Sequence, residues 1–103
     1  MCRIERSLIR RSVMAIALIL NALDMTAQQY DRILHDLEAK GLAAPDGRLC
    51  HIACAADDGW MVFDVWESEE KLRRFANILM PTIAAEGITL TQPRMVAVHN
   101  MIQ

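Results

Sequence analysis

The sequence predicts an α+β domain whose strands and helices follow in the order β-α-β-β-α-β, the split-βαβ or ferredoxin-like plan. Two stretches, residues 26–41 and 68–87, have apolar residues at helical spacing behind a capping residue. They alternate with apolar stretches rich in β-branched and aromatic residues, and a turn signal, Asp57-Asp58-Gly59, separates the two central ones. This plan gives a four-stranded antiparallel sheet with both helices on one face.

The first strand is predicted at residues 13–20, where every residue is apolar, as in a strand buried on both faces. This run is too short to span a bilayer as a helix, and no Ala-x-Ala cleavage site follows it, so we expect neither a membrane span nor secretion. Residues 1–12 are expected to form a basic N-terminal tail. Residues 13–103 are expected to form a single domain, because the chain supplies one core.

The first helix is predicted to begin behind Thr26, because Thr26 and Gln29 match the capping box, in which the two side chains satisfy free amides reciprocally. Apolar residues at helical spacing mark its inner face, and these are Tyr30, Ile33, Leu34, Leu37 and Leu42. Gly41 is expected to end the helix, and residues 43–47 to form a turn.

Residues 48–55 and 60–66 are predicted to pair as a β-hairpin. Two registers are plausible, with either Asp57-Asp58 or Asp58-Gly59 at the centre of the turn. Both place His51 on the same face as Asp64 and Trp66, because side chains alternate between faces along a strand. His51 lies opposite Asp64 in the first register and opposite Trp66 in the second.

The second helix is predicted to begin behind Ser68, with Glu69 and Glu70 at its positive end. Pro81 should kink or split it, because proline removes a backbone donor. Its buried stripe consists of Leu72, Phe75, Ala76, Leu79 and Ile83. Residues 88–93 are expected to connect it to a last strand at residues 94–102, which carries His99.

Apolar residues on both faces of the predicted sheet indicate a homodimer. The central strand has Trp60, Val62 and Trp66 on one face and Met61, Phe63 and Val65 on the other. Two helices can cover only one of these faces. A second copy of the same sheet is therefore the expected cover for the other.

The composition excludes several classes of function. The net charge is −2, from 11 basic and 13 acidic residues, which argues against a nucleic-acid surface. No Gly-rich loop follows a strand, and no zinc-ligand spacing occurs. The three cysteines are an odd number, and we expect Cys50 and Cys54 to be reduced core residues of a cytoplasmic protein.

Val-Trp-Glu-Ser at residues 65–68, followed by Phe75, resembles the strand-to-helix junction of the dimeric α/β-barrel superfamily. That superfamily includes the antibiotic-biosynthesis-type monooxygenases, and the chain is similar to its small bacterial members. The resemblance implies cofactor-independent oxidation of an electron-rich aromatic or polyketide ligand. It does not extend to the haem-degrading branch, because Phe75 and Ala85 stand where that branch has tryptophan and histidine.

His51 with Asp64 is the candidate catalytic pair. A carboxylate beside an imidazole fixes its tautomer and strengthens it as a general base. A cross-strand pair that only satisfies two polar groups in the sheet is the alternative. Four further residues are candidates for the wall of a ligand cavity, although each also suits ordinary packing or an edge position: Trp66, Tyr30, Phe75 and His99.

Three functions stay open at this point. In the first case the protein is a dimer that binds, and oxidises or isomerises, an apolar aromatic metabolite in a pocket between sheet and helices, with His51 and Asp64 as the base. In the second case the same pocket belongs to a non-catalytic binding or sensing module. In the third the protein is a structural dimer with a packed interior. The fold alone does not choose among them.

Overall fold

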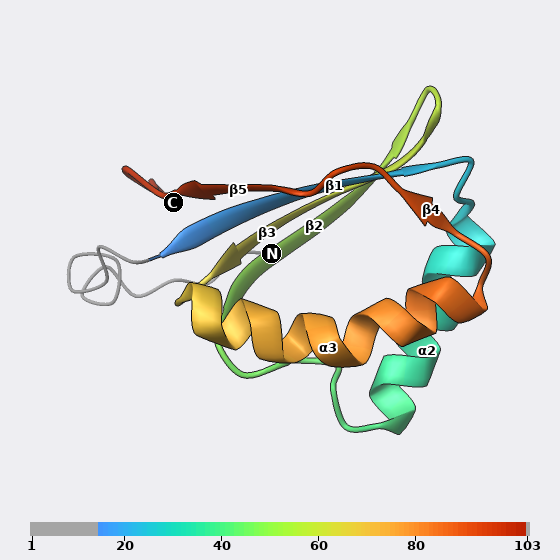
Figure 1. Cartoon of the computed structure of the whole chain (residues 1–103), viewed down its shortest axis with the longest axis horizontal. Helices are drawn as coiled ribbons and strands as arrows, with labels where there is room; N and C mark the ends of the chain where they lie inside the picture. The colour runs from blue at the N-terminus through green and yellow to red at the C-terminus, as the bar shows by residue number, and fades with distance from the viewer. Residues whose placement is uncertain (1–14, 103) are drawn as a thin grey trace.

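The structure, a computed structural model that describes residues 15–102, confirms the α+β plan with two helices on one face of an antiparallel sheet (Figure 1). The predicted basic tail, residues 1–12, and the start of the predicted first strand lie outside the described residues. The elements in chain order are β1 (Ile16–Leu23), α2 (Ala27–Ala39), β2 (Arg48–Ala56), β3 (Gly59–Trp66), α3 (Glu69–Ala85), β4 (Thr89–Leu90) and β5 (Arg94–Ala97).

The sheet has the strand order β2-β3-β1-β4, and β5 also pairs with β1. The predicted last strand, residues 94–102, is wrong in its extent: β4 pairs with residues 22–23 of β1, and β5 pairs with residues 16–19. Pro93 lies between the two short strands and has no N–H to continue the ladder. Just beyond β5, the Val98 amide still donates a backbone hydrogen bond to the Ala15 carbonyl at 2.9 Å.

Both helices begin as their capping residues predict. Thr26 and Gln29 form the complete capping box at α2, and the Ser68 side chain accepts a hydrogen bond from the Lys71 amide at α3. Pro81 does not split α3, which runs unbroken through it. Phe75 and Ile83, on either side of the proline, are buried in the same core, and this packing holds the two halves of the helix together.

The main core lies between the helices and the sheet. Trp66 is fully buried there, and the other buried members are Leu18, Leu20, Ile33, Leu37, Leu72, Phe75 and Ile83. They come from alternate positions of β1 and β3 and from one stripe of each helix, as the two periodicities require. The helix-covered face of the sheet is therefore packed by this chain alone.

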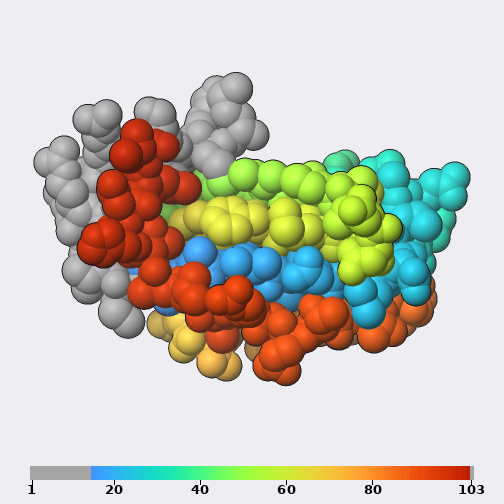
Figure 2. Space-filling model, turned by 90° about the horizontal axis from the view of Figure 1, so that it is seen from above, coloured from blue at the N-terminus to red at the C-terminus, as the bar shows by residue number. Residues whose placement is uncertain are grey.

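The opposite face of the sheet carries no helix in residues 15–102, and Figure 2 shows β2, β3 and β1 side by side across it. The register places Ile19, Phe63 and Ile52 in one row on this face. Ile52 is 44% exposed and Val96, in β5, is also 44% exposed. We call this surface the open sheet face, and its row of apolar side chains is continuous across three strands.

The hairpin turn has Asp57-Asp58 at its centre, because Ala56 pairs with Gly59. Gly59 has φ 148°, and a Cβ at this position would press against the backbone oxygen of Ala22 and lie 2.8 Å from the Asp24 nitrogen. Only glycine fits there. Gly59→Ala should lower the free energy of unfolding by about 1–3 kcal/mol, because both the backbone conformation and the contact become strained.

Urea unfolding of Gly59→Ala and Gly87→Ala checks this prediction. Gly87 also has a positive φ, 71°, but a Cβ there would meet nothing within 4 Å, so it controls for backbone conformation alone. Its replacement should cost about 1 kcal/mol. Equal losses in the two variants would show that the approach of Gly59 to β1 is unimportant.

No helix of the described part of the chain is long and apolar enough to cross a membrane.

Cys54 is a free cysteine, but Cys50 is disulfide-bonded, so the expectation of a reduced cysteine is wrong at Cys50.

Candidate functional site

A small cavity of about 70 Å³ lies between the helices and the sheet. Its wall is mostly apolar, and the polar side chains on it come from Tyr30, Arg48, His51, Trp60 and Asp64. A ligand larger than this cavity must displace side chains, and the cavity is flanked by adaptable ones: Met25, Leu34, Leu79 and Leu90.

His51 and Asp64 lie directly opposite each other on the helix-covered face, in the first of the two predicted registers. Nδ1 of His51 is 2.6 Å from Oδ1 of Asp64, and Nε1 of Trp66 donates to Oδ2 of Asp64 at 3.2 Å. The Asp64 side chain is 7% exposed and the His51 side chain 21%. A carboxylate held by two donors keeps His51 in the tautomer that carries its proton on Nδ1.

Tyr30 of α2 completes this arrangement. Its Oη is 2.5 Å from Nε2 of His51, and the two rings are parallel, with an interplanar angle of 3° and centroids 6.0 Å apart. Since Nδ1 of His51 donates to Asp64, Nε2 is the acceptor and the tyrosine O–H is the donor. Tyr30, His51 and Asp64 therefore form a hydrogen-bonded chain from the cavity wall into the sheet, which we call the relay.

Burial raises the pKa of Tyr30 above its ordinary value of 10.0; nearby Arg48 lowers it, and Asp64 and Asp31 raise it. The chain has one tyrosine, so tyrosinate absorbance reports this residue alone. We expect Tyr30 to titrate above pH 10 in the native protein and near pH 10 in the unfolded protein.

As pH rises, Tyr30 therefore loses its hydroxyl proton in the unfolded state before it does so in the native state. The stability that Tyr30 contributes is present below about pH 10 and is lost as pH rises through the folded pKa. Tyr30→Phe should flatten this alkaline loss when urea midpoints are compared across pH. Identical titration of native and unfolded protein would contradict the raised pKa.

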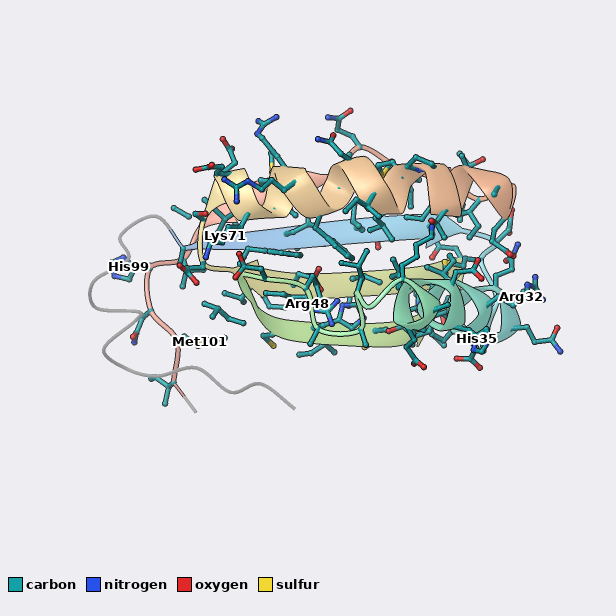
Figure 3. All side chains as sticks on the ribbon, turned by 90° about the horizontal axis from the view of Figure 1, so that it is seen from below. Arg32, His35, Arg48, Lys71, His99 and Met101 are labelled. Carbon is teal, nitrogen blue, oxygen red and sulfur yellow. The ribbon has the colours of Figure 1, made fainter. Side chains whose placement is uncertain are left out.

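The structure separates the other predicted cavity residues. Phe75 lines the cavity and packs on Trp66, with ring centroids 5.3 Å apart. Trp66 does not line it; this side chain is fully buried and supports Asp64 instead. His99 is exposed beyond the end of β5, and Figure 3 shows it past the end of the sheet, far from Arg48. It is not among the residues that line the cavity.

Two features of this site were missed at the level of sequence. Arg48 was placed in a strand without a role, yet it lines the cavity, and Figure 3 shows it on the helix side of the sheet. The contact of Tyr30 with His51 was also missed, although Tyr30 was expected on the inner stripe of α2. Within residues 15–102, no three His, Cys, Asp or Glu side chains gather as metal ligands.

No protein-family model matches the sequence, and no curated protein matches it either. Solved structures do match. A mutant of SnoaB, a cofactor-independent oxygenase from Streptomyces nogalater, superposes with a TM-score of 0.63 at 14% identity, over 85% of this chain and 96% of that one. A candidate antibiotic biosynthesis monooxygenase from Deinococcus radiodurans gives 0.58 at 14% identity, over 87% and 97%.

A candidate antibiotic biosynthesis monooxygenase from Caulobacter crescentus gives a TM-score of 0.58 at 18% identity, over 86% of this chain and 92% of that one. Structural similarity at sequence identities this low indicates a shared fold and does not indicate a shared reaction. The chain therefore has the ferredoxin-like fold of the antibiotic-biosynthesis-monooxygenase-like proteins, as the junction at residues 65–68 led us to expect.

Proposed function

We propose that the protein is a homodimer that binds a small aromatic metabolite in the helix-side cavity and oxidises it with dioxygen, without a cofactor. The relay carries this proposal. It ends at an apolar cavity, and an imidazole with a fixed tautomer, backed by a buried carboxylate, is the arrangement that a general base needs. The fold shared with a cofactor-independent oxygenase supports it.

The first step is removal of a proton from the ligand. A phenol or enol O–H of the ligand donates to Oη of Tyr30, and the tyrosine O–H proton passes to Nε2 of His51. The products are a ligand anion and an imidazolium that donates from Nδ1 to the Asp64 carboxylate. The neutral tyrosine suits this role, since burial disfavours its charged form.

The second step is oxidation of that anion. Dioxygen forms a C–O bond at the electron-rich ring carbon, and the resulting peroxide anion takes the proton back from His51 through Tyr30. Loss of water from the hydroperoxide leaves a carbonyl, so that one CH₂ and one O₂ become one C=O and one H₂O. The apolar wall excludes water from the anion and the peroxide.

The homodimer rests on the open sheet face. Ile52, Phe63 and Ile19 form an apolar row there that no helix of residues 15–102 covers. Ile52 is exposed and the other two are half-buried, and contiguous accessible apolar surface of this kind marks an interaction site in a small protein. A twofold contact of this face with itself buries the same row on both copies.

Oxygen uptake tests the reaction. The protein is incubated with a hydroxylated anthrone or a naphthol, and uptake is recorded with an oxygen electrode, with the uncatalysed rate subtracted. We expect uptake proportional to protein concentration and quinone-type products. Binding of these compounds without uptake would favour the binding or sensing module, and neither binding nor uptake would remove the proposal.

A further inference from the structure

We propose that the ligand is an aromatic acid with a hydroxyl group, whose acidic group binds Arg48 and whose hydroxyl oxygen lies between Tyr30 and Trp60. This inference rests on the proposed function and names the chemical class of its substrate. It is carried by a β-bulge that turns Arg48 into the cavity and by a buried indole N–H that lacks a partner.

The bulge lies at the start of β2. Arg48 pairs with Trp66 and Cys50 with Val65, so three residues of β2 stand against two of β3, and Leu49 is the extra one. Without the bulge, Arg48 would point to the open sheet face, because it is an odd number of residues away from His51. The bulge instead places both side chains on the helix-covered face, where both line the cavity.

Arg48 has binding capacity left for a ligand. Its one side-chain hydrogen bond recorded in the described part of the chain runs from Nη2 to the Ala43 carbonyl at 3.0 Å, and no ion pair recorded within residues 15–102 involves it. A guanidinium has five N–H donors. Asp64, the carboxylate on the same wall, is already held by His51 and Trp66. An anionic group of the ligand would therefore meet an uncompensated cation.

Trp60 supplies the second contact. Its Nε1–H is buried and has no hydrogen-bond partner among the residues that the structure describes, and Trp60 lines the cavity. Its ring packs on Tyr30, with centroids 5.3 Å apart. A ligand oxygen that donates to Oη of Tyr30 is then in place to accept from the indole. This donor would stabilise the charge that develops on that oxygen as the relay takes its proton.

The two contacts come from different positions along the β2–β3 hairpin. Arg48 pairs with Trp66 and Ala55 with Trp60, while His51 lies between them along β2. A ligand that meets both contacts through a single ring therefore has its acidic group and its hydroxyl on opposite sides of that ring. One ring is the size that requires the least movement of the cavity wall.

The test compares two probes of the same shape, 4-hydroxybenzoate and 4-hydroxybenzamide, by isothermal titration under nitrogen, where no turnover occurs. The first is an anion at neutral pH and the second is not. We expect the wild-type protein to bind the benzoate about tenfold more tightly or better, since a partly buried ion pair of this kind is charge-assisted. Arg48→Gln should abolish that preference.

Arg73→Gln is the matched control, because it removes the same charge from an exposed side chain of α3 that does not line the cavity. It should leave the preference intact. Trp60→Phe should weaken both probes by the same factor, since it removes the N–H and keeps an aromatic ring. Equal binding of the two probes by the wild type, binding of neither, or a preference that survives Arg48→Gln would each overturn the inference.

The result separates from that of the oxygen experiment. Arg48-dependent binding of the benzoate without any oxygen uptake would remove the proposed reaction and leave the aromatic acid as the ligand class. Oxidation of anthrones or naphthols with no Arg48-dependent preference for the benzoate would keep the proposed reaction and remove the aromatic acid as the ligand class.

Discussion

Replacing His51 with glutamine should lower kcat/KM for oxygen-dependent turnover by about 10²–10⁴-fold, the usual contribution of a positioned general base. Glutamine can still donate to a neighbouring oxygen, but it cannot accept a proton and hold it. The proton of the ligand would then have no acceptor at the end of the relay, because Tyr30 takes it only by passing its own to His51. Initial rates of oxygen uptake at several ligand concentrations measure the effect.

His35→Gln is the matched control for this variant. His35 is also a histidine of the described fold, but it is exposed on α2 and does not line the cavity, so the same substitution should leave turnover unchanged. The thermal midpoint of each variant shows whether it is folded, because His51→Gln replaces the imidazole that contacts the buried Asp64 carboxylate with a side chain of another shape. Wild-type rates in a folded His51→Gln protein would take the role of base away from His51.

The helices could be predicted closely because their signals are local. Thr26 with Gln29, and Ser68 with Glu69 and Glu70, act within one turn of chain, and α2 and α3 begin directly behind them. Pro81 is the exception. Its local effect predicts a break, yet burial of Phe75 and Ile83 against the sheet outweighs the one backbone hydrogen bond that proline removes.

The strands at the edge of the sheet could be predicted only in outline. Where a strand ends depends on its partner, and the partner of residues 94–102 is β1, which is far away in sequence. Pro93 interrupts the pairing on one side, and pairing with β1 stops at Ala97 on the other. His99 was therefore placed in a strand that does not reach it, and this explains why it was expected near a cavity that it does not line.

The candidate site also has one part that could be predicted from the sequence and another that could not. The pairing of His51 with Asp64 follows from alternation and turn length, both of which can be read from residues 48–66. The position of Arg48 does not, because the bulge at Leu49 has no glycine or other residue in the sequence that marks it. The reach of Tyr30 to His51 depends on how α2 lies over the sheet, which no residue of α2 specifies alone.

Replacing Ile52 with glutamate should convert the proposed dimer into a monomer. Ile52 stands 44% exposed at the β2 end of the apolar row on the open sheet face, so a self-contact of that face would bury two unpaired carboxylates, one from each copy. Each such burial costs on the order of 3 kcal/mol. The dissociation constant should therefore rise by about 10³-fold or more. Sedimentation velocity at micromolar concentration, against the chain mass of 11.6 kDa, measures the change.

Ile78→Glu distinguishes loss of the interface from a general effect of a surface carboxylate. Ile78 is 41% exposed, almost as much as Ile52, but it lies on α3, on the other side of the sheet. This variant should sediment as the wild type does.

A wild-type protein that sediments as a single chain would remove the homodimer. Dissociation caused by Ile78→Glu, with Ile52→Glu still dimeric, would instead place the interface on α3. Because the relay and the cavity lie on the helix-covered face within one chain, a monomeric Ile52→Glu protein should still bind the ligand.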